Sequence, residues 1–399
     1  MSAPAALISG AGIAGPTLAY WLLRAGWTPT LIERAPEARK GGYVIDFWGL
    51  GYDIAERIGL AEEIQRIGYH VQELRIVGDR GGRTAGFGAA VFRQLTGGRY
   101  VTVKRTDLAA LLLAKVADRC EVVFGEEIVG LDENPGGVDV RFRRGGARRF
   151  DIVVGADGLH SRLRALDLGP EADSEVFLGY VVAAFEAQDY RPRDDDVYVI
   201  HNEPGLMLAR FAQKDDTTLF LFVAALEPGE SAGAQEGEGQ KSLLAARCST
   251  MRWMEAPRIY CALQSAESIY FDRVSQIQLD RWSRGRVALV GDAAFCPSLL
   301  AGQGTALAMT ASYVLAGELV RHGGDHADGF QSYERLLRPF IQRKQNAAKG
   351  FARAFAPRTR LGILFRNAVV RAAAAPVLSR LTVGRDVADR IALPNYCWD

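Results

Sequence analysis

A short apolar strand, a glycine-rich turn and a helix follow one another at the start of the chain, and this order limits the fold more than any other feature. Residues 5–9 are apolar, the turn reads Gly10-x-Gly12-x-x-Gly15, and residues 16–25 have helical spacing. A second apolar segment covers residues 29–33. Strand, turn, helix and strand in this order predict a βαβ unit, the building block of a doubly wound α/β sheet.

Each glycine of this turn has its own physical use. The first permits a tight turn, the second lets a pyrophosphate approach the backbone, and the third lets the helix pack closely on the strand. Phosphate then lies at the amino end of the helix. Glu33 ends the second strand, from which a carboxylate can accept hydrogen bonds from ribose hydroxyls. The unit predicts a dinucleotide site but does not distinguish FAD from NAD.

A second string, Asp151-Ile-Val-Val-Gly-Ala-Asp157-Gly158, reads as a buried strand with an Asp-Gly pair at its carboxyl end. Ligands collect at the carboxyl ends of strands in sheets of this kind. Ser161 and Arg164 follow at helical spacing. The pair alone is more typical of an ordinary turn beside a solvated arginine, whereas the whole string favours a ligand site.

A third string places a carboxylate and several backbone amides beside a ligand. An apolar strand ends at Gly291-Asp292, a turn containing Pro297 follows, and Gly302-Gln-Gly304 opens a helix. Together with the early glycine turn, this arrangement indicates a flavin. Asp292 is also placed to cap the helix beyond it, and both roles can hold together.

The remaining periodicity predicts a discontinuous nucleotide domain with a β-rich insertion. Short alternating segments predict a hairpin over 73–92 and strands at 181–185, 197–200, 206–211, 218–224 and 259–262, with an exposed loop at 228–240. Helices are expected at 52–58, 106–117 with Thr106 as N-cap, 305–321, 330–356 and 368–381. The predicted domains are a Rossmann-like FAD-binding domain (1–72, 99–172 and 281–355), a β-sheet-rich substrate domain (73–98 and 173–280) and a C-terminal helical tail packing across both (356–399).

Charge and cysteine content exclude several classes of protein. Lys and Arg number 48 against 47 Asp and Glu, so nothing points to nucleic acid, and a small, weakly polar ligand fits better. The five scattered cysteines argue against a zinc site or a disulfide framework and favour a reducing cytoplasm. Residues 5–23 lack the basic leader of a signal peptide, and no apolar run is long enough for a membrane helix.

The three strings, in this order, resemble the fingerprints of single-component flavoprotein aromatic monooxygenases, the para-hydroxybenzoate hydroxylase superfamily. The resemblance runs over most of the first 350 residues. Within the superfamily the chain is most similar to tetracycline-inactivating and polyketide-tailoring oxygenases. That similarity rests on Glu33-Arg34, on Gly41-Gly42 with Asp46, and on Lys104-Arg105-x-Asp107-Leu108.

The resemblance implies FAD as the cofactor and NADPH or NADH as the electron donor. Glu33 and Arg34 would contact the adenosine, Asp46 and Arg105 the flavin, and Asp292 the ribityl chain, while Arg39 matches a position linked to NADPH. The full set expected to bind the cofactor is Gly10, Gly12, Ala14, Gly15, Glu33, Arg34, Asp46, Arg105, Asp157, Gly291, Asp292, Gly302 and Gly304.

The chain departs from the family after Gly304. Ala306 and Thr310 stand where the family usually has Asn and Asp. A flavin contact is therefore missing or replaced. This departure motivates an alternative function, a flavoprotein that holds FAD structurally and shapes a cyclisation without redox turnover.

The expected reaction is insertion of one oxygen atom from O2 into an aromatic or polycyclic, polyketide-like or antibiotic-like molecule through a flavin hydroperoxide. No catalytic side chain and no metal are assigned, because the flavin carries the chemistry. His160 and His201 are given no catalytic role. The protein is expected to be a monomer or homodimer. The candidate pocket residues are Tyr43, Phe47, Trp48, Phe185, Met207, Phe220, Phe222, Phe295 and Pro297. Of these, Phe185, Met207, Phe220 and Phe222 are expected on strands, where such residues more often belong to the core.

Overall fold

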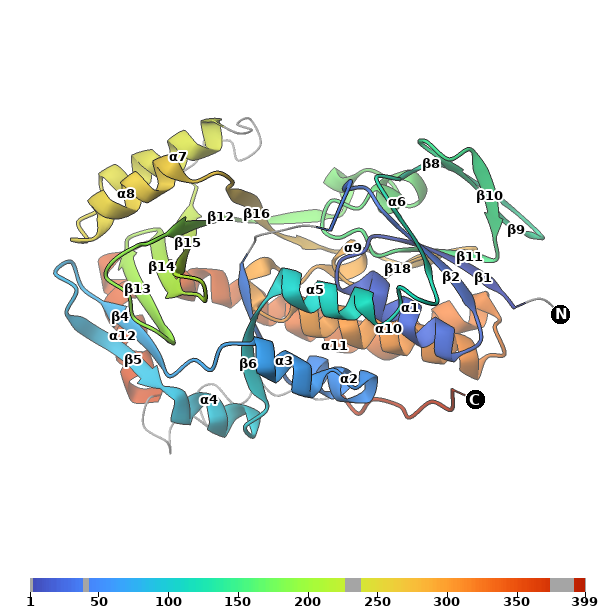
Figure 1. The fold of residues 1–399 in the computed structure, drawn as a ribbon, viewed down its shortest axis with the longest axis horizontal. Helices are drawn as coiled ribbons and strands as arrows, with labels where there is room; N and C mark the ends of the chain where they lie inside the picture. Colours follow the sequence, from blue (N-terminus) through green and yellow to red (C-terminus); the bar gives the residue numbers. More distant parts are fainter. Residues whose placement is uncertain (1–2, 39–42, 227–237, 374–390, 399) are drawn as a thin grey trace.

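The computed structural model describes residues 3–38, 43–226, 238–373 and 391–398 and has two halves, each built on a β-sheet (Figure 1). The first sheet has six strands. They are β1 (Ala5–Ser9), β2 (Thr28–Glu33), β7 (Glu121–Phe124), β11 (Ile152–Gly155), β17 (Ser283–Arg284) and β18 (Val287–Leu289), in the order β17-β18-β11-β1-β2-β7. All neighbours pair parallel except β17 with β18.

Helices cover this sheet and complete the largest core. They are α1 (Ala14–Arg24), α2 (Leu50–Ile58), α3 (Ala61–Ile67), α5 (Arg105–Ala114), α6 (Arg162–Asp167), α9 (Asp292–Phe295), α10 (Gly304–Arg321) and α11 (His326–Phe355). Helix α10 is apolar on nearly all sides, as expected of a helix enclosed by others, and Leu307 to Leu319 are buried in it. The strands come from three distant parts of the sequence, so this half is discontinuous.

The second sheet has seven strands in the order β16-β12-β15-β14-β13-β4-β5. Helices α7 and α8 cover one of its faces, and the other face is turned toward the first half (Figure 1). The members are β4 (Glu73–Val77), β5 (Arg83–Gly88), β12 (Glu175–Gln188), β13 (Val197–Glu203), β14 (Leu206–Ala212), β15 (Thr217–Ala225), β16 (Tyr270–Ile277), α7 (Glu238–Ser249) and α8 (Ala256–Ser265).

Smaller elements complete the described chain. A two-stranded ribbon of β3 (Val44–Trp48) and β6 (Tyr100–Lys104) lies between the halves, and a three-stranded sheet flanks the first. The others are β8 (Ile128–Asn134), β9 (Gly137–Phe142), β10 (Ala147–Phe150), α4 (Ala89–Thr96), α12 (Arg360–Ala373) and the short 3-10 turns η1 (Glu171–Asp173) and η2 (Leu299–Ala301). No helix of the described ranges is long and apolar enough to cross a membrane.

Several expected elements are wrong, and each error has a local cause. Residues 259–262 belong to helix α8, because Ala256, Ile259 and Leu263 have helical spacing and Pro257 opens the first turn. Residues 89–92 begin α4 instead of continuing a strand. Helix α5 begins at Arg105 with Lys104 as N-cap, so Thr106 does not cap it.

Two further expectations fall partly outside the described residues. Of the loop expected at 228–240, residues 228–237 lie outside them, and the remainder already belongs to α7. The helix expected at 368–381 corresponds to α12, which begins eight residues earlier, at Arg360. His201 is part of β13.

Residues 391–398 form a terminal strap against α1 and α10. The Tyr313 hydroxyl donates to the Pro394 carbonyl (2.7 Å), and the Tyr396 hydroxyl donates to Glu318 (2.6 Å). Trp398 stacks on Trp21 with ring centroids 4.6 Å apart. By contrast, α12 packs on β5 and β13 of the second sheet.

Replacing Gly317 with alanine should loosen this strap. A Cβ there would lie 2.2 Å from the Tyr396 ring, so the ring must move, and overpacking of this kind costs about 1–3 kcal/mol. Gly350→Ala in α11 is the matched control, because its Cβ meets no atom within 4 Å. Urea unfolding should show a loss for Gly317→Ala and a gain of up to about 1 kcal/mol for Gly350→Ala. Equal stabilities would contradict the packing described.

Candidate cofactor site

The three glycines of the first turn occupy three different environments. Gly10 has φ +112°, and a Cβ there would lie 2.4 Å from the Ala156 carbonyl oxygen. A Cβ on Gly15 would lie 1.9 Å from the Gly10 carbonyl oxygen. A Cβ on Gly12 would meet only the Arg105 guanidinium, at 4.0 Å. Gly10 and Gly15 therefore serve the packing of strand and helix, whereas the backbone at Gly12 is open to a ligand.

Two helix N-termini meet beside this opening. A Cβ on Gly291 would lie 3.3 Å from the Cβ atoms of both Ala14 and Ala308, which shows how closely α1 and α10 approach each other here. Neither helix has a side-chain N-cap or an acidic residue in its first turn. Uncapped N-termini carry partial positive charge and free N–H donors. Their convergence creates a site suited to an anion such as a pyrophosphate.

Arg105 adds a full positive charge to this site. Its backbone N–H donates to the Tyr43 carbonyl (3.2 Å), which fixes the start of α5 beside the glycine turn. The nearby Tyr43 hydroxyl raises the pKa of Arg105, burial opposes this, and Asp292 raises it further. Among the described residues, no carboxylate forms an ion pair with this guanidinium. A dianionic pyrophosphate would be an anionic partner for this guanidinium.

Glu33 is positioned by the turn itself. Its carboxylate accepts hydrogen bonds from the backbone N–H groups of Ala11 and Ala35, both at 3.0 Å. A carboxylate has about four acceptor positions, so positions remain for ribose hydroxyls. Arg34, the next residue, is exposed, and Arg39 lies outside the described residues.

The Asp292 carboxylate lies beside the N-terminus of α10. A Cβ on Gly304, the first residue of that helix, would be 3.5 Å from its Oδ1. Burial raises the pKa of Asp292 and Arg105 opposes this shift. The N-cap of α9 is Gly291, so Asp292 is the first residue of that helix and not its cap. Gly302 ends η2 in the left-handed conformation, with φ +65°.

Two predicted cofactor residues make other contacts. Asp157 accepts from Ser161 Oγ (2.5 Å) and from the Leu163 N–H (3.0 Å), so its carboxylate holds the start of α6. Asp46 Oδ1 accepts from the hydroxyls of Tyr100 (2.7 Å), Thr102 (2.7 Å) and Tyr198 (3.1 Å). These contacts join the β3–β6 ribbon to the second sheet, and cofactor roles for Asp46 and Asp157 stay predictions.

The two residues that depart from the family pattern lie in a helix contact. A Cβ on Gly51 would be 2.7 Å from the Cα of Ala306, so α2 and α10 cross closely at this pair. Thr310 is buried, and its hydroxyl has no hydrogen-bond partner among the described residues. Because the small side chain of Ala306 permits this close crossing, packing explains why alanine stands here in place of the family's Asn.

The faces of the second sheet decide which predicted pocket residues can contact a ligand. Side chains alternate between faces along a strand. Phe185, Phe220 and Phe222 lie in the cluster beneath α7 and α8, and Phe185 stacks on Phe220 at 4.9 Å. They face away from the first half, and their pocket roles stay predictions. Met207 lies on the other face, which we call the near face.

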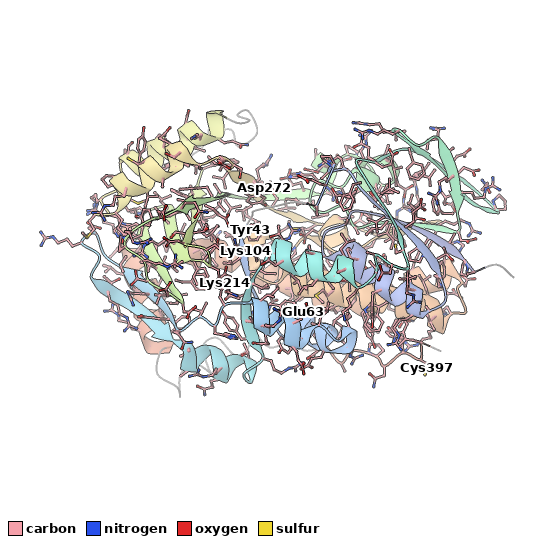
Figure 2. The ribbon with its side chains drawn as sticks, in the orientation of Figure 1. Tyr43, Glu63, Lys104, Lys214, Asp272 and Cys397 are labelled. Atoms are coloured by element: carbon pink, nitrogen blue, oxygen red, sulfur yellow. The ribbon has the colours of Figure 1, made fainter. Side chains whose placement is uncertain are left out.

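The other predicted pocket residues also differ in their surroundings. Phe47 and Phe295 are each 1% exposed and belong to the core of the first half, where Phe295 packs on Trp282 at 4.5 Å, and pocket roles for both stay predictions. Tyr43 lies at the site, with its ring 5.3 Å from that of Tyr270 (Figure 2). Trp48 is half-buried on β3, and the Pro297 carbonyl accepts from Gln276. Pocket roles for Trp48 and Pro297 stay predictions.

Sequence reasoning missed the charged residues that surround this region. Lys104, the last residue of β6 (Figure 2), forms an ion pair with Glu186 of β12 (3.3 Å). His160 lies between Glu171 (2.9 Å) and Asp272 (3.2 Å). These hydrogen bonds, with Asp272 first, raise the pKa of His160 to about 10. Only strand alternation would have indicated Glu186, and nothing in the sequence pairs His160 with Asp272.

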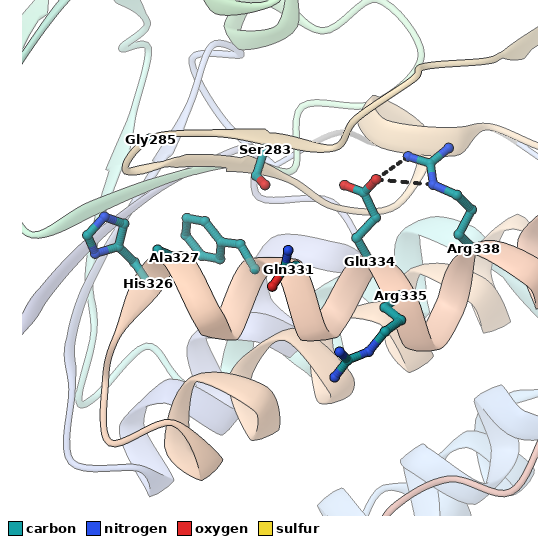
Figure 3. A pocket seen from close by; sticks show the side chains of 9 residues that line it. Ser283, Gly285, His326, Ala327, Gln331, Glu334, Arg335 and Arg338 are labelled. Atoms are coloured by element: carbon teal, nitrogen blue, oxygen red, sulfur yellow. Dashed lines mark hydrogen bonds and ion pairs between the residues drawn. The ribbon is translucent and has the colours of Figure 1, made fainter.

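A separate surface groove of about 580 Å³ lies beside the start of α11 (Figure 3). It is lined by Ser283, Gly285, His326 and Glu334 among others, and Glu334 is bonded to Arg338. Gly285 precedes β18, so the groove lies at the amino ends of the parallel strands. The glycine turn lies at their carboxyl ends, where ligands bind in such sheets. The groove is therefore not the cofactor site.

Comparisons with known proteins agree with this geometry. A family model described as an FAD binding domain matches residues 4–348. A flavin-dependent monooxygenase from an unknown prokaryotic organism is 31% identical over 98% of this chain and 98% of its own. The chain belongs to the family of FAD-dependent monooxygenases. Membership confirms the predicted enzyme class and FAD as the cofactor, and NAD(P)H is the usual electron donor of the family.

Other relatives cover nearly the whole chain. An uncharacterized protein of Mycobacterium tuberculosis is 36% identical over 85% of this chain and 91% of its own length. The crystal structure of tetracycline destructase Tet(55) is 28% identical and has a TM-score of 0.83, with 99% of both chains covered. The family fold therefore extends through both halves of the molecule.

Alanine substitutions at Gly12 and Gly15 should have different effects, the first on FAD binding and the second on stability. Gly12→Ala should leave the stability of the FAD-free chain near that of the wild type but weaken FAD binding at least tenfold, because the new Cβ points into the ligand opening. Gly15→Ala should lower the free energy of unfolding by about 3 kcal/mol through its clash with Gly10. Urea unfolding and flavin titration measure the two effects, and a stable Gly15→Ala chain would contradict the close packing.

His160 should make stability depend on pH in the alkaline range. Its folded pKa lies above the ordinary 6.5, so its contribution is complete below pH 6.5 and is lost as pH rises through about 10. His160→Gln should remove this part of the profile. Half of the side chain is exposed, so the contribution is about 1 kcal/mol or less. Denaturant unfolding from pH 6 to 10 measures it, with the exposed His70→Gln as control.

Proposed function

We propose that this enzyme hydroxylates a planar aromatic or polycyclic small molecule, of polyketide or antibiotic-like type, that carries an acidic phenol or enol. The observation that supports the substrate class is the composition of the near face. Met207, Ala209 and Leu221 make the near face apolar. The ion pair of Lys104 with Glu186 places charged groups where the β3–β6 ribbon meets this face. Pockets for such ligands combine apolar walls with a few placed polar groups.

The chain's own residues hold the cofactor and shield the reacting region. Bound FAD would accept electrons from NAD(P)H and activate O2. The N-termini of α1 and α10 and the Arg105 guanidinium would hold the pyrophosphate. Tyr43 and Tyr270 close one side of the site with their rings. The near face would exclude water from the substrate, and Lys104 would orient its acidic oxygen.

The proposal is tested on the purified protein loaded with FAD. Phenolic polycyclic compounds should stimulate NADPH oxidation at least tenfold, and ¹⁸O2 should give a product heavier by one labelled oxygen atom. If no compound of a broad panel stimulated the reaction, the substrate class would be wrong. Anaerobic mixing with NADPH should bleach the flavin, whereas a non-redox cyclase would keep its colour.

Lys104→Met should weaken substrate binding without affecting the flavin. We expect KM for a phenolic substrate to rise about tenfold, which corresponds to about 1.4 kcal/mol, while anaerobic flavin reduction in the absence of substrate stays as in the wild type. The exposed Lys115→Met is the matched control. An unchanged KM would remove Lys104 from the substrate site.

The proposal includes a cytoplasmic location and a monomeric or homodimeric state. All five cysteines are free thiols, as they would be in a reducing compartment. Gel filtration with light scattering measures the mass of the assembly in solution.

A further inference from the structure

Three residues with metal-ligating side chains lie together at one end of the second sheet, outside the flavin site. His201 and Glu203 are alternate residues of β13 and therefore point to the same face. His201 pairs with Val77 in the parallel ladder of β13 and β4, so the turn after β4 brings Asp79 alongside Glu203. His201 Nε2 is 3.6 Å from Glu203 Oε1 and 3.9 Å from Asp79 Oδ1.

The hydrogen bond of the other ring nitrogen fixes the tautomer of His201. Nδ1 lies 3.3 Å from the Val77 carbonyl oxygen, which can only accept, so Nδ1 carries the proton. Nε2 of the neutral ring then presents a lone pair. The side chain is 1% exposed, and Nε2 has no hydrogen-bond partner among the described residues. Trp253 stacks on the ring at 5.3 Å and holds its plane.

Of the three ligand atoms, His201 Nε2 is the one that is buried without a hydrogen-bond partner in the described part of the chain, while Glu203 Oε1 accepts from the Arg252 backbone N–H. A buried acceptor without a partner costs about 1–3 kcal/mol. A cation bound among the three atoms removes this cost for Nε2 and is also attracted by the two carboxylates.

We propose that Asp79, His201 and Glu203 form a binding site for a divalent transition metal ion, with Zn²⁺ the best fit. Imidazole nitrogen and carboxylate oxygen are both zinc ligands, and bonds of about 2.0–2.1 Å in a tetrahedron place the ligand atoms roughly 3.4 Å apart. The observed separations of 3.6 and 3.9 Å need only small shifts. The Nδ1–H bond to a backbone carbonyl is the usual support of a metal-bound histidine.

Arg252 is the competing cation in this arrangement. Its backbone N–H donates to Glu203 Oε1 (2.6 Å), and its guanidinium lies 3.5 Å from Asp79 Oδ2, the oxygen remote from His201. The guanidinium side chain is 52% exposed and makes no contact that satisfies Nε2. It therefore offsets the acidic charge without filling the space among the three ligand atoms, and its removal should favour a metal ion.

The test uses the FAD-loaded protein after chelator treatment, with Zn²⁺ as the probe. Competition with a chromophoric chelator should give one Zn²⁺ per chain, and absorption at the zinc edge should show one imidazole and oxygen ligands. Asp79→Asn, Glu203→Gln and His201→Gln should each weaken binding at least tenfold. His70→Gln, an exposed histidine elsewhere, should bind as the wild type. NADPH oxidation should be the same with and without Zn²⁺.

Arg252→Gln separates the proposal from a simple ion-pair network. A metal site predicts tighter Zn²⁺ binding in this variant, because a competing positive charge is gone. Absence of stoichiometric binding in both the wild type and Arg252→Gln would overturn the proposal, as would unchanged binding in Asp79→Asn. Asp79 is 46% exposed, so its variant keeps the fold and remains informative should His201→Gln unfold.

Discussion

The close approach of α1 and α10 to the ends of β1 and β18 is the constraint on which the rest of the structure depends. It requires residues without a Cβ at Gly15 and Gly291, because the neighbouring atoms would otherwise lie within 1.9 and 3.3 Å of that carbon. The approach brings two uncapped helix ends together at the carboxyl ends of the strands. Attraction for a pyrophosphate follows from backbone geometry before any charged side chain contributes.

The second sheet divides its residues between two tasks. One face packs beneath α7 and α8 and holds Phe185, Phe220 and Phe222, so it stabilises the fold. The near face is turned toward the first half and is mostly aliphatic, with Tyr180 and Tyr270 among its residues. Aromatic character alone is therefore a poor indicator of the site, and the face on which a strand residue lies is a better one.

The βαβ unit, the Asp-Gly string and the Gly291-Asp292 segment could be predicted from the sequence because their physics is local. A tight turn needs glycine, and a buried parallel strand is a run of apolar residues. The face on which Phe220 lies could not be predicted, since a shift of register by one residue reverses it. The pairing of His160 with Asp272, 112 residues away, and of Asp79 with His201 depends on tertiary contacts that no spacing encodes.

Asp46 links the β3–β6 ribbon to the second sheet through hydroxyl groups alone. Tyr100, Thr102 and Tyr198 all donate to one of its oxygens, and burial raises the pKa of both tyrosines well above its ordinary value. The donors carry no charge, so dissolved ions have little to screen at this junction. The position of the second sheet against the β3–β6 ribbon is consequently insensitive to ionic strength at this contact, unlike surface links between charged pairs.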